Sequence, residues 1–172
     1  IDNLDITDQN ATDDFIQSIH PDIIVHCAAY TNVDKAENDS ENAYKINCDG
    51  TRNVAMAANK AGALMVYIST DYVFDGTKNT LYLPTDETNP QNVYGSSKLA
   101  GEKEVIKNCE KYYIARTSWL YGHNGKNFVE TMIALSKNPE LKVVDDQTGC
   151  PTWTVALCRA IITLISNQKP YG

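Results

Sequence analysis

The chain of 172 residues is long enough for one domain with a hydrophobic core, and 42% of its residues are hydrophobic, a share typical of soluble globular proteins. The formal net charge of −7 argues against a nucleic-acid-binding surface, which would need clustered Lys and Arg. No apolar run approaches the length of a membrane-spanning helix, so neither nucleic acid nor a membrane is an expected partner.

The first half of the chain predicts two helices around one strand. The stretch "TDDFIQSIH" (12–20) has helical apolar spacing, with Thr12 as its N-cap. The run "PDIIVHCAAYT" (21–31) predicts a strand buried on both faces. The stretch 39–62 predicts a long helix that begins at Asp39 or Ser40 and is closed by Gly62, with small residues that allow close packing on a sheet.

The second half continues the alternation of strands and helices. We expect strands at "ALMVYIST" (63–70), "KYYIARTSWLYG" (111–122) and "LKVVDD" (141–146), and helices from about Tyr94 to Cys109, at 127–138 and at 154–167. Such alternation predicts an α/β fold with a parallel sheet covered by helices. The longest loop, 76–93, is a candidate lid over the strand ends.

Cysteine and histidine usage gives no sign of a metal site. The five cysteines are scattered and form no C-x-x-C pair, which predicts reduced thiols in a cytoplasmic protein, most of them small core residues. The three histidines show no ligand spacing, and no metal site is predicted. The N-terminus is polar and acidic, unlike a signal peptide. Because the chain begins with Ile1 and ends at "NQKPYG", we expect it to be part of a longer protein.

Polar side chains gather where the predicted strands end, which is where parallel α/β sheets bind ligands. Ser69 and Thr70 follow one strand, and Tyr94 and Lys98 lie one helical turn apart at the start of the next helix. A neighbouring ammonium would lower the pKa of the phenol, which could then donate a proton to a carbonyl oxygen held by a hydroxyl. Such chemistry needs a hydride donor, which no side chain supplies.

Simpler interpretations of these residues stay open. Tyr94 and Lys98 alone could be an incidental pair on a solvated helix face. Ser69 and Thr70 could bond only to their own backbone. The combination of motifs decides between these possibilities.

Two stretches carry a family resemblance, "YISTDYVFDG" (67–76) and "YGSSKLAGE" (94–102). Together with "PDIIVHCAAYTNVDKAE", "RTSWLYG" and "DDQTGCPT" they make the chain resemble the extended short-chain dehydrogenase/reductase family, and within it the dTDP-4-dehydrorhamnose reductases. The resemblance implies a Rossmann-like doubly wound parallel sheet that is incomplete at both ends. Residues 1–172 would be the central portion of an NAD(P)-binding domain, with the substrate-binding part starting near the C-terminus.

The resemblance also implies a set of site residues. Thr70, Tyr94 and Lys98 would be the catalytic trio, and Lys98 would also bind the nicotinamide ribose. Asn47 would sit on a helix facing the site. The residues implied to contact the cofactor, NADPH or NADH, are Asp5, Ile6, Ala29, Tyr30, Thr31, Tyr94 and Lys98. Those implied to contact the nucleotide-sugar are Thr70, Asp71 and Trp119. Structural roles compete with these: Asp5 and Thr7 could cap the following helix, Ala29 could be core, and Trp119 could be packing.

The implied reaction is reduction of the C4 ketone of dTDP-4-dehydro-L-rhamnose to dTDP-L-rhamnose. The family is also associated with Mg²⁺, for which the sequence offers no ligand set, and a homodimer is a further expectation. Two alternatives remain: a non-catalytic regulatory subunit like the methionine adenosyltransferase beta subunit, and a sister nucleotide-sugar epimerase or dehydratase. The presence of Thr70, Tyr94 and Lys98 favours catalysis, and a single acidic residue after Thr70, Asp71, favours simple reduction.

The sequence lacks the glycine-rich turn that seats a pyrophosphate on a helix N-terminus, and none of its nine glycines forms a G-x-x-G-x-x-G pattern. The residue that distinguishes NADH from NADPH should also lie upstream of this chain. We therefore expect the 172-residue chain alone to bind dinucleotide weakly. Calorimetric titration with NADPH tests this, and a micromolar affinity would contradict it.

Overall fold

The structure is a computed structural model that describes residues 4–125, 127–138, 140–143, 145 and 147–172. The chain divides into two compact units, the first extending to Arg116 and including Tyr171–Gly172, the second comprising Thr117–Pro170. The first unit holds a three-stranded sheet and the second a two-stranded one. The alternation of strands and helices confirms the predicted α/β class.

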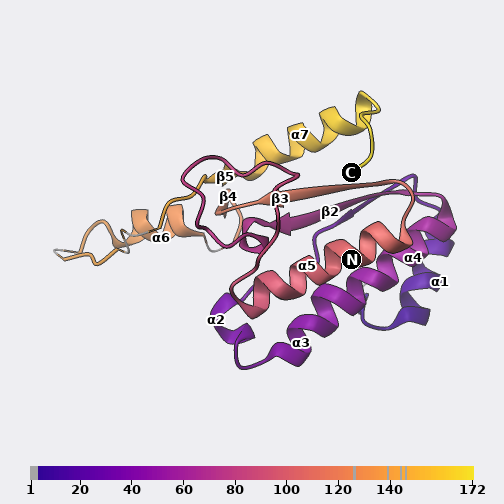
Figure 1. Ribbon diagram of the computed structural model, residues 1–172, viewed down its shortest axis with the longest axis horizontal. Helices are drawn as coiled ribbons and strands as arrows, with labels where there is room; N and C mark the ends of the chain where they lie inside the picture. The colour runs from indigo at the N-terminus through magenta and orange to yellow at the C-terminus, as the bar shows by residue number, and fades with distance from the viewer. Residues whose placement is uncertain (1–3, 126, 139, 144, 146) are drawn as a thin grey trace. The chain divides into compact units, whose positions relative to one another are not determined.

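The sheet of the first unit has the strand order β1-β2-β3, from β1 (Ile23–His26), β2 (Leu64–Thr70) and β3 (Tyr112–Thr117). Strands β1 and β2 are parallel, with Ile23 opposite Leu64 and His26 opposite Tyr67, so their carboxyl ends lie at one edge of the sheet. Strands β2 and β3 lie side by side in Figure 1. The central strand β2 is buried along most of its length.

Strand β1 differs from the expectation of burial on both faces. Ile23 and Val25 are 42% and 49% exposed, whereas His26 is buried. The difference arises because β1 is an edge strand of this sheet, and the described residues leave one of its faces uncovered.

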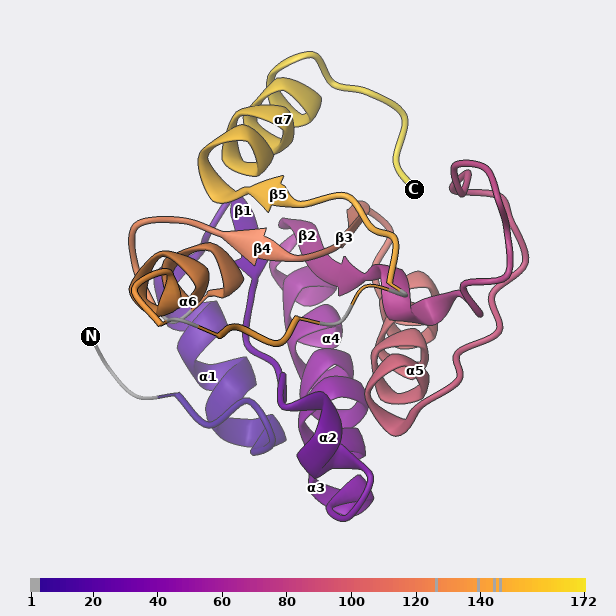
Figure 2. The same cartoon turned by 90° about the vertical axis from the view of Figure 1, so that its left-hand side faces the viewer.

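Helices α1 (Gln9–Ile19), α4 (Thr51–Ala61) and α5 (Val93–Asn108) lie side by side on one face of this sheet (Figure 2). Helix α1 starts earlier than predicted, because Asp8 caps it by accepting a hydrogen bond from the Ala11 amide. Thr12, the predicted N-cap, is instead buried inside the helix. The core formed between helices and sheet includes Ile16, Val54, Ala58, Met65, Tyr67 and Val105.

The predicted helix at 39–62 is interrupted in its middle. After the short helix α2 (Val33–Ala36), helix α3 (Ser40–Tyr44) passes into a π-helical segment (Lys45–Gly50), which leads directly into α4. Gly62 ends α4 with a positive φ of 70°, as predicted. The π-helical segment was not predicted. A π-helical turn contains one extra residue relative to an α-helix, and this leaves the apolar spacing along 39–62 nearly unchanged.

The second unit contains β4 (Leu120–Tyr121), α6 (Phe128–Leu135), β5 (Thr152–Trp153) and α7 (Thr154–Ser166). Strands β4 and β5 pair in parallel. The predicted strand 111–122 is therefore divided, and Trp119 at the break has a positive φ of 46°. The strand expected at 141–146 does not form at 141–143 or 145, and Val144 and Asp146 lie outside the described residues.

Two further observations concern the whole chain. Of the five cysteines, all within the described residues, Cys109 is buried, one is half-buried and three are exposed, so the expectation that most would be core residues is wrong. Within the described residues, no helix combines the length and apolar character that crossing a membrane would take.

Gly101 of helix α5 gives a test of the packing. A Cβ at this position would lie 2.5 Å from the Tyr67 hydroxyl oxygen and closer still to the Asn47 carbonyl oxygen. We expect Gly101→Ala to lower the free energy of unfolding by ~1–3 kcal/mol, because the added methyl pushes α5 away from its neighbours. Urea denaturation measures this, with Lys103→Ala on the exposed face of α5 as control. Equal midpoints for both variants would contradict the close approach.

Candidate active site

The carboxyl end of β2 meets the N-terminus of α5, and this brings Thr70 and Tyr94 together. Helix α5 begins at Val93 because Asn92 caps it, accepting a hydrogen bond from the Gly95 amide at 2.7 Å. Tyr94 therefore lies in the first turn, and its phenol lies close to the Thr70 side chain. Gly95 permits this approach, since a Cβ there would overlap the Tyr72 carbonyl oxygen.

Thr70 also organises the short 3-10 turn that follows β2, Asp71–Val73. Its Oγ1 accepts a hydrogen bond from the Tyr72 amide and donates one to Asp71 Oδ1, both at 3.2 Å. Burial raises the pKa of the half-buried Asp71 carboxyl, and the Thr70 bond opposes that shift. The local-backbone interpretation of Thr70 is thus observed together with its contact to Tyr94.

The environment of Tyr94 reverses one sequence-based expectation. Burial raises the pKa of the phenol, the Thr70 hydrogen bond opposes this, and Asp71 and Tyr72 raise it further. The expectation of a pKa lowered by Lys98 is wrong, because the cost of burying a phenolate outweighs the contribution of a nearby cation. Tyr94 therefore keeps its proton at neutral pH and can act as a hydrogen-bond or proton donor.

Lys98 lies beneath the strand end, with only 2% of its surface exposed. Its Nζ donates a hydrogen bond of 2.7 Å to the Ile68 carbonyl and lies 4.1 Å from the centroid of the Tyr67 ring. Burial lowers the pKa of Lys98 to about 8, and the Glu102 carboxylate opposes the shift. The ammonium has three donors. Because Ile68 is its one hydrogen-bond acceptor among the described residues, donors remain for a ligand.

The buried Asn47, in the π-helical segment, fixes the chain after β1. Its Oδ1 accepts from the Tyr30 amide at 2.8 Å, and its Nδ2 donates to the Tyr30 carbonyl at 3.1 Å and to Ser97 Oγ at 3.0 Å. The loop Ala29–Thr31, expected to follow the cofactor, is thereby held at the carboxyl edge of the sheet. Within it Thr31 is exposed, while Ala29 and Tyr30 are half-buried.

The remaining predicted residues lie elsewhere. Asp5 is exposed and accepts hydrogen bonds from the Thr7 amide and hydroxyl. The alternative that Asp5 and Thr7 cap the following helix is wrong, because Asp8 caps it. The Ile6 carbonyl accepts from Asn53 Nδ2 at 2.9 Å, linking this segment to α4. Trp119 belongs to the second unit, where its 42% exposed ring lies against Gly149.

Sequence reasoning missed Glu102 and Arg116. Ser69, one of the two candidate hydroxyls, points into the protein and donates to Glu102 Oε1 at 2.5 Å, and Arg116 pairs with the same carboxylate. The signal was available, because Glu102 ends the "SKLAGE" stretch four residues after Lys98. Of the two hydroxyls, the one that contacts Tyr94 is therefore that of Thr70. Among the described residues, no three His, Cys, Asp or Glu side chains gather as metal ligands.

One more titratable group lies next to Lys98, the buried His26 at the end of β1. Its Nε2 lies 3.0 Å from Thr51 Oγ1, and its ring stacks on Tyr67 with centroids 5.5 Å apart. Burial, assisted by the Lys98 charge, lowers the pKa of His26 to about 4. The imidazole is therefore neutral in the folded protein near pH 6.

Comparison with known proteins gives consistent matches. The family model described as RmlD substrate binding domain matches residues 1–171. The chain is 45% identical over 169 residues to the dTDP-4-dehydrorhamnose reductase of Escherichia coli, covering 96% of this chain and 56% of that protein. It is 44% identical to the Mycobacterium tuberculosis enzyme of the same name, covering 93% of this chain and 54% of that protein.

Solved structures match in the same way. A crystal structure of dTDP-4-dehydrorhamnose reductase from Bacillus anthracis in complex with NADP has a TM-score of 0.95 and 50% identity, covering 98% of this chain and 60% of that one. The Clostridium acetobutylicum orthologue gives the same values. These matches confirm the Rossmann-like fold, and the chain spans little more than half the length of its relatives.

The buried His26 makes stability depend on pH. Its pKa is 6.5 when unfolded and about 4 when folded, so between these values the unfolded state binds more protons. The free energy of unfolding should therefore fall by about 3 kcal/mol as the pH drops from 6.5 to 4, on this account alone.

His26→Gln removes this titration while keeping a group that can bond Thr51. Urea denaturation across the same pH range should therefore give a shallower dependence for His26→Gln than for the unsubstituted protein. His20→Gln, at an exposed position, is the matched control for removing a histidine. Identical pH dependence in the unsubstituted and His26→Gln proteins would show that His26 is not held neutral.

Proposed function

Because this chain belongs to the RmlD substrate binding domain family, we propose that it carries the catalytic residues of an NAD(P)H-dependent reductase. The reaction is reduction of the C4 ketone of dTDP-4-dehydro-L-rhamnose to dTDP-L-rhamnose. The observation that carries the proposal is the proximity of Thr70 and Tyr94 at the carboxyl end of β2, with buried Lys98 one turn further along α5 and bonded to the Ile68 carbonyl. The relatives that bear the reductase name support the substrate.

The roles of the three residues follow from their surroundings. Tyr94 is the proton donor, since burial keeps its phenol protonated at neutral pH. The Thr70 hydroxyl, which lies close to Tyr94, is the group proposed to hold the same substrate oxygen. Lys98 is the group that orients a ribose hydroxyl and supplies positive charge near the phenol, using the donors that Ile68 leaves available. Asp71 and Trp119 are further proposed contacts to the nucleotide-sugar.

The nicotinamide cofactor, when bound, supplies the hydride that no side chain can provide. NADP in the Bacillus anthracis relative supports this choice. The residues present fit a nicotinamide cofactor, because the Lys98 ammonium keeps N–H groups that Ile68 does not use. Asn47 also bonds to both the amide and the carbonyl of Tyr30, in the loop assigned to the cofactor. We assign the cofactor to Asp5, Ile6, Ala29, Tyr30, Thr31, Tyr94 and Lys98. A cytoplasmic location is also proposed, because scattered cysteines with no C-x-x-C pair and a nicotinamide reductant fit a reducing compartment.

Tyr94→Phe in the full-length protein tests the role of the phenol. We expect turnover of dTDP-4-dehydrorhamnose, followed as loss of NADPH absorbance, to fall ~10²–10⁴-fold, because proton donation is lost. NADPH affinity should be nearly unchanged. The control is Tyr112→Phe at the opposite, amino end of β3. An unaltered rate in Tyr94→Phe would move the proton donor elsewhere, and no NADPH oxidation by the unsubstituted protein would favour a regulatory subunit.

A further inference from the structure

Glu102 is a buried carboxylate, 1% exposed, that the proposed chemistry does not use. Its Oε1 accepts hydrogen bonds from Ser69 Oγ at 2.5 Å and from Arg116 Nε at 2.9 Å. Its Oε2 accepts from Arg116 Nη2 at 2.7 Å. The pair is bidentate and charge-assisted, the geometry with the strongest directional preference among side-chain contacts. Buried ion pairs often stabilise a fold no better than apolar residues would. Stability alone therefore does not explain why a charged pair occupies this position.

The position of Glu102 on α5 gives that explanation. Tyr94, Lys98 and Glu102 are spaced by four residues and therefore share one face of the helix. Each lies against a different residue at the end of β2: Lys98 bonds to the Ile68 carbonyl, Glu102 bonds to Ser69, and Tyr94 lies close to Thr70. Hydrogen bonds thus attach two successive strand residues to two turns of the helix, and the third strand residue adjoins the turn that carries Tyr94. The strand end that carries Thr70 cannot slide along α5 without breaking these hydrogen bonds.

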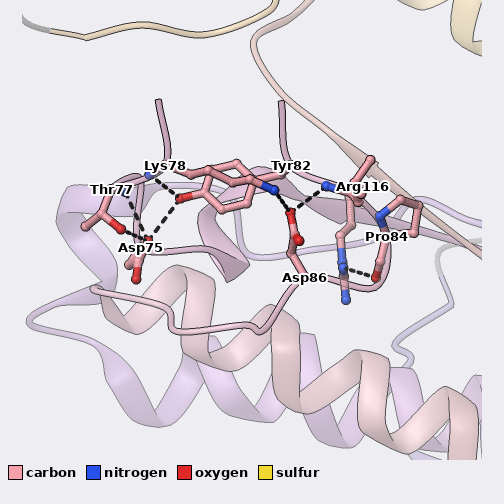
Figure 3. A network of polar contacts seen from close by, with 8 residues as sticks. Asp75, Thr77, Lys78, Tyr82, Pro84, Asp86 and Arg116 are labelled. Atoms are coloured by element: carbon pink, nitrogen blue, oxygen red, sulfur yellow. Dashed lines mark hydrogen bonds and ion pairs between the residues drawn. The ribbon is translucent and has the colours of Figure 1, made fainter. Parts of the chain in front are cut away.

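Arg116, at the end of β3, extends the same connection to the loop after β2. Its Nη1 donates to the Pro84 carbonyl at 3.2 Å, and its guanidinium lies 5.0 Å from the Phe74 ring centroid. Phe74 in turn stacks on Tyr82 with centroids 4.3 Å apart. Figure 3 shows Arg116 beside Pro84, with Tyr82 in the adjoining network.

Hydrogen bonds and an ion pair connect distant parts of the loop 74–86 to one another. Tyr82 donates to Asp75 Oδ1 at 3.0 Å, and Lys78 pairs with Asp86 (Figure 3). The Leu83 amide donates to the same Asp86 carboxylate at 2.7 Å. Consequently, the one carboxylate of Glu102 connects helix α5, the end of β2 and, through Arg116, the loop 74–86.

We propose that Glu102 is a positioning residue, which acts through Ser69 and Arg116 to hold Thr70 and the loop 74–86 in one arrangement against Tyr94. The inference rests on the proposed function, because the arrangement matters for turnover only if Thr70 and Tyr94 act on one substrate oxygen. Glu102 itself touches neither substrate nor cofactor in this scheme. Its removal should therefore affect turnover through geometry, not through binding.

Two substitutions separate the connections. Glu102→Gln replaces one carboxylate oxygen with an NH₂ group, which donates and cannot accept from the Arg116 guanidinium. The bidentate pair is lost, and with it the hold of Arg116 on the loop 74–86. Ser69→Ala leaves both partners of the Glu102–Arg116 pair in place and removes the hydroxyl that links Glu102 to the strand end, so it is the second variant should Glu102→Gln fail to fold. The matched control is Glu104→Gln on the same helix, whose carboxylate bonds to Asn108.

The first measurement is steady-state kinetics of the full-length protein. We expect kcat to fall ~10- to 100-fold in Glu102→Gln and Ser69→Ala, since a misplacement of about 1 Å has effects of this size. NADPH affinity should stay nearly unchanged, and Ser69→Thr, which keeps the hydroxyl, should restore part of kcat. In a Thr70→Ala background, Ser69→Ala should cost little more, because both act on the same contact. A lowered unfolding midpoint with unchanged kcat in both variants would reduce Glu102 to a structural role and overturn the proposal.

Limited proteolysis provides a readout that does not depend on activity. Glu102→Gln should speed cleavage within residues 76–92 relative to Glu104→Gln, whereas Ser69→Ala should not. If the unsubstituted protein oxidises no NADPH, the proposed function fails by itself. The loop measurement then still decides the positioning claim, which equal cleavage of Glu102→Gln and Glu104→Gln would overturn.

Discussion

The seam between helix α5 and the end of strand β2 is the constraint on which the rest of the site depends. Lys98 and Glu102 bond to Ile68 and Ser69 in a region almost closed to water, and Tyr94, one turn before Lys98, lies close to Thr70. Two glycines make the approach possible, because a methyl group at Gly95 or Gly101 would overlap main-chain oxygen atoms. The proposed chemistry and the packing of this fold therefore use the same helix face, so a change to one is expected to affect the other.

Burial at this seam decides the protonation of its groups. It raises the pKa of Tyr94 and lowers those of Lys98 and His26, so in each case the uncharged form gains. Reasoning from spacing alone considers the attraction between two neighbouring charges. The structure adds the larger cost of removing each charge from water. Arg116 balances the one carboxylate that stays buried nearby, that of Glu102, through a direct bidentate pair.

Much of this arrangement could be predicted from the sequence, and the failures have physical causes. Apolar periodicity located the main helices and strands of the first unit, and the order of strands placed Thr70 and Tyr94 at one edge. Periodicity could not predict that Ile23 and Val25 of β1 are exposed, because this depends on which other elements cover that face of the strand. Nor could it predict the sign of the Tyr94 pKa shift, which depends on solvent. Glu102 was overlooked because its partners, Ser69 and Arg116, are distant in sequence and meet only in the folded chain.

The π-helical segment between α3 and α4 limits which deletions this protein can tolerate during evolution. The segment carries Asn47, which forms two hydrogen bonds with the Tyr30 backbone. A π-helical turn contains an extra residue relative to a continuous α-helix. Loss of that residue would restore regular winding and rotate everything before it by about a quarter-turn or more relative to α4. Loops elsewhere tolerate changes of length. At this point in the helix, a deletion that makes the winding regular would turn Asn47 away from the Tyr30 backbone to which it bonds, so a more regular helix would lose the anchor of the loop after β1.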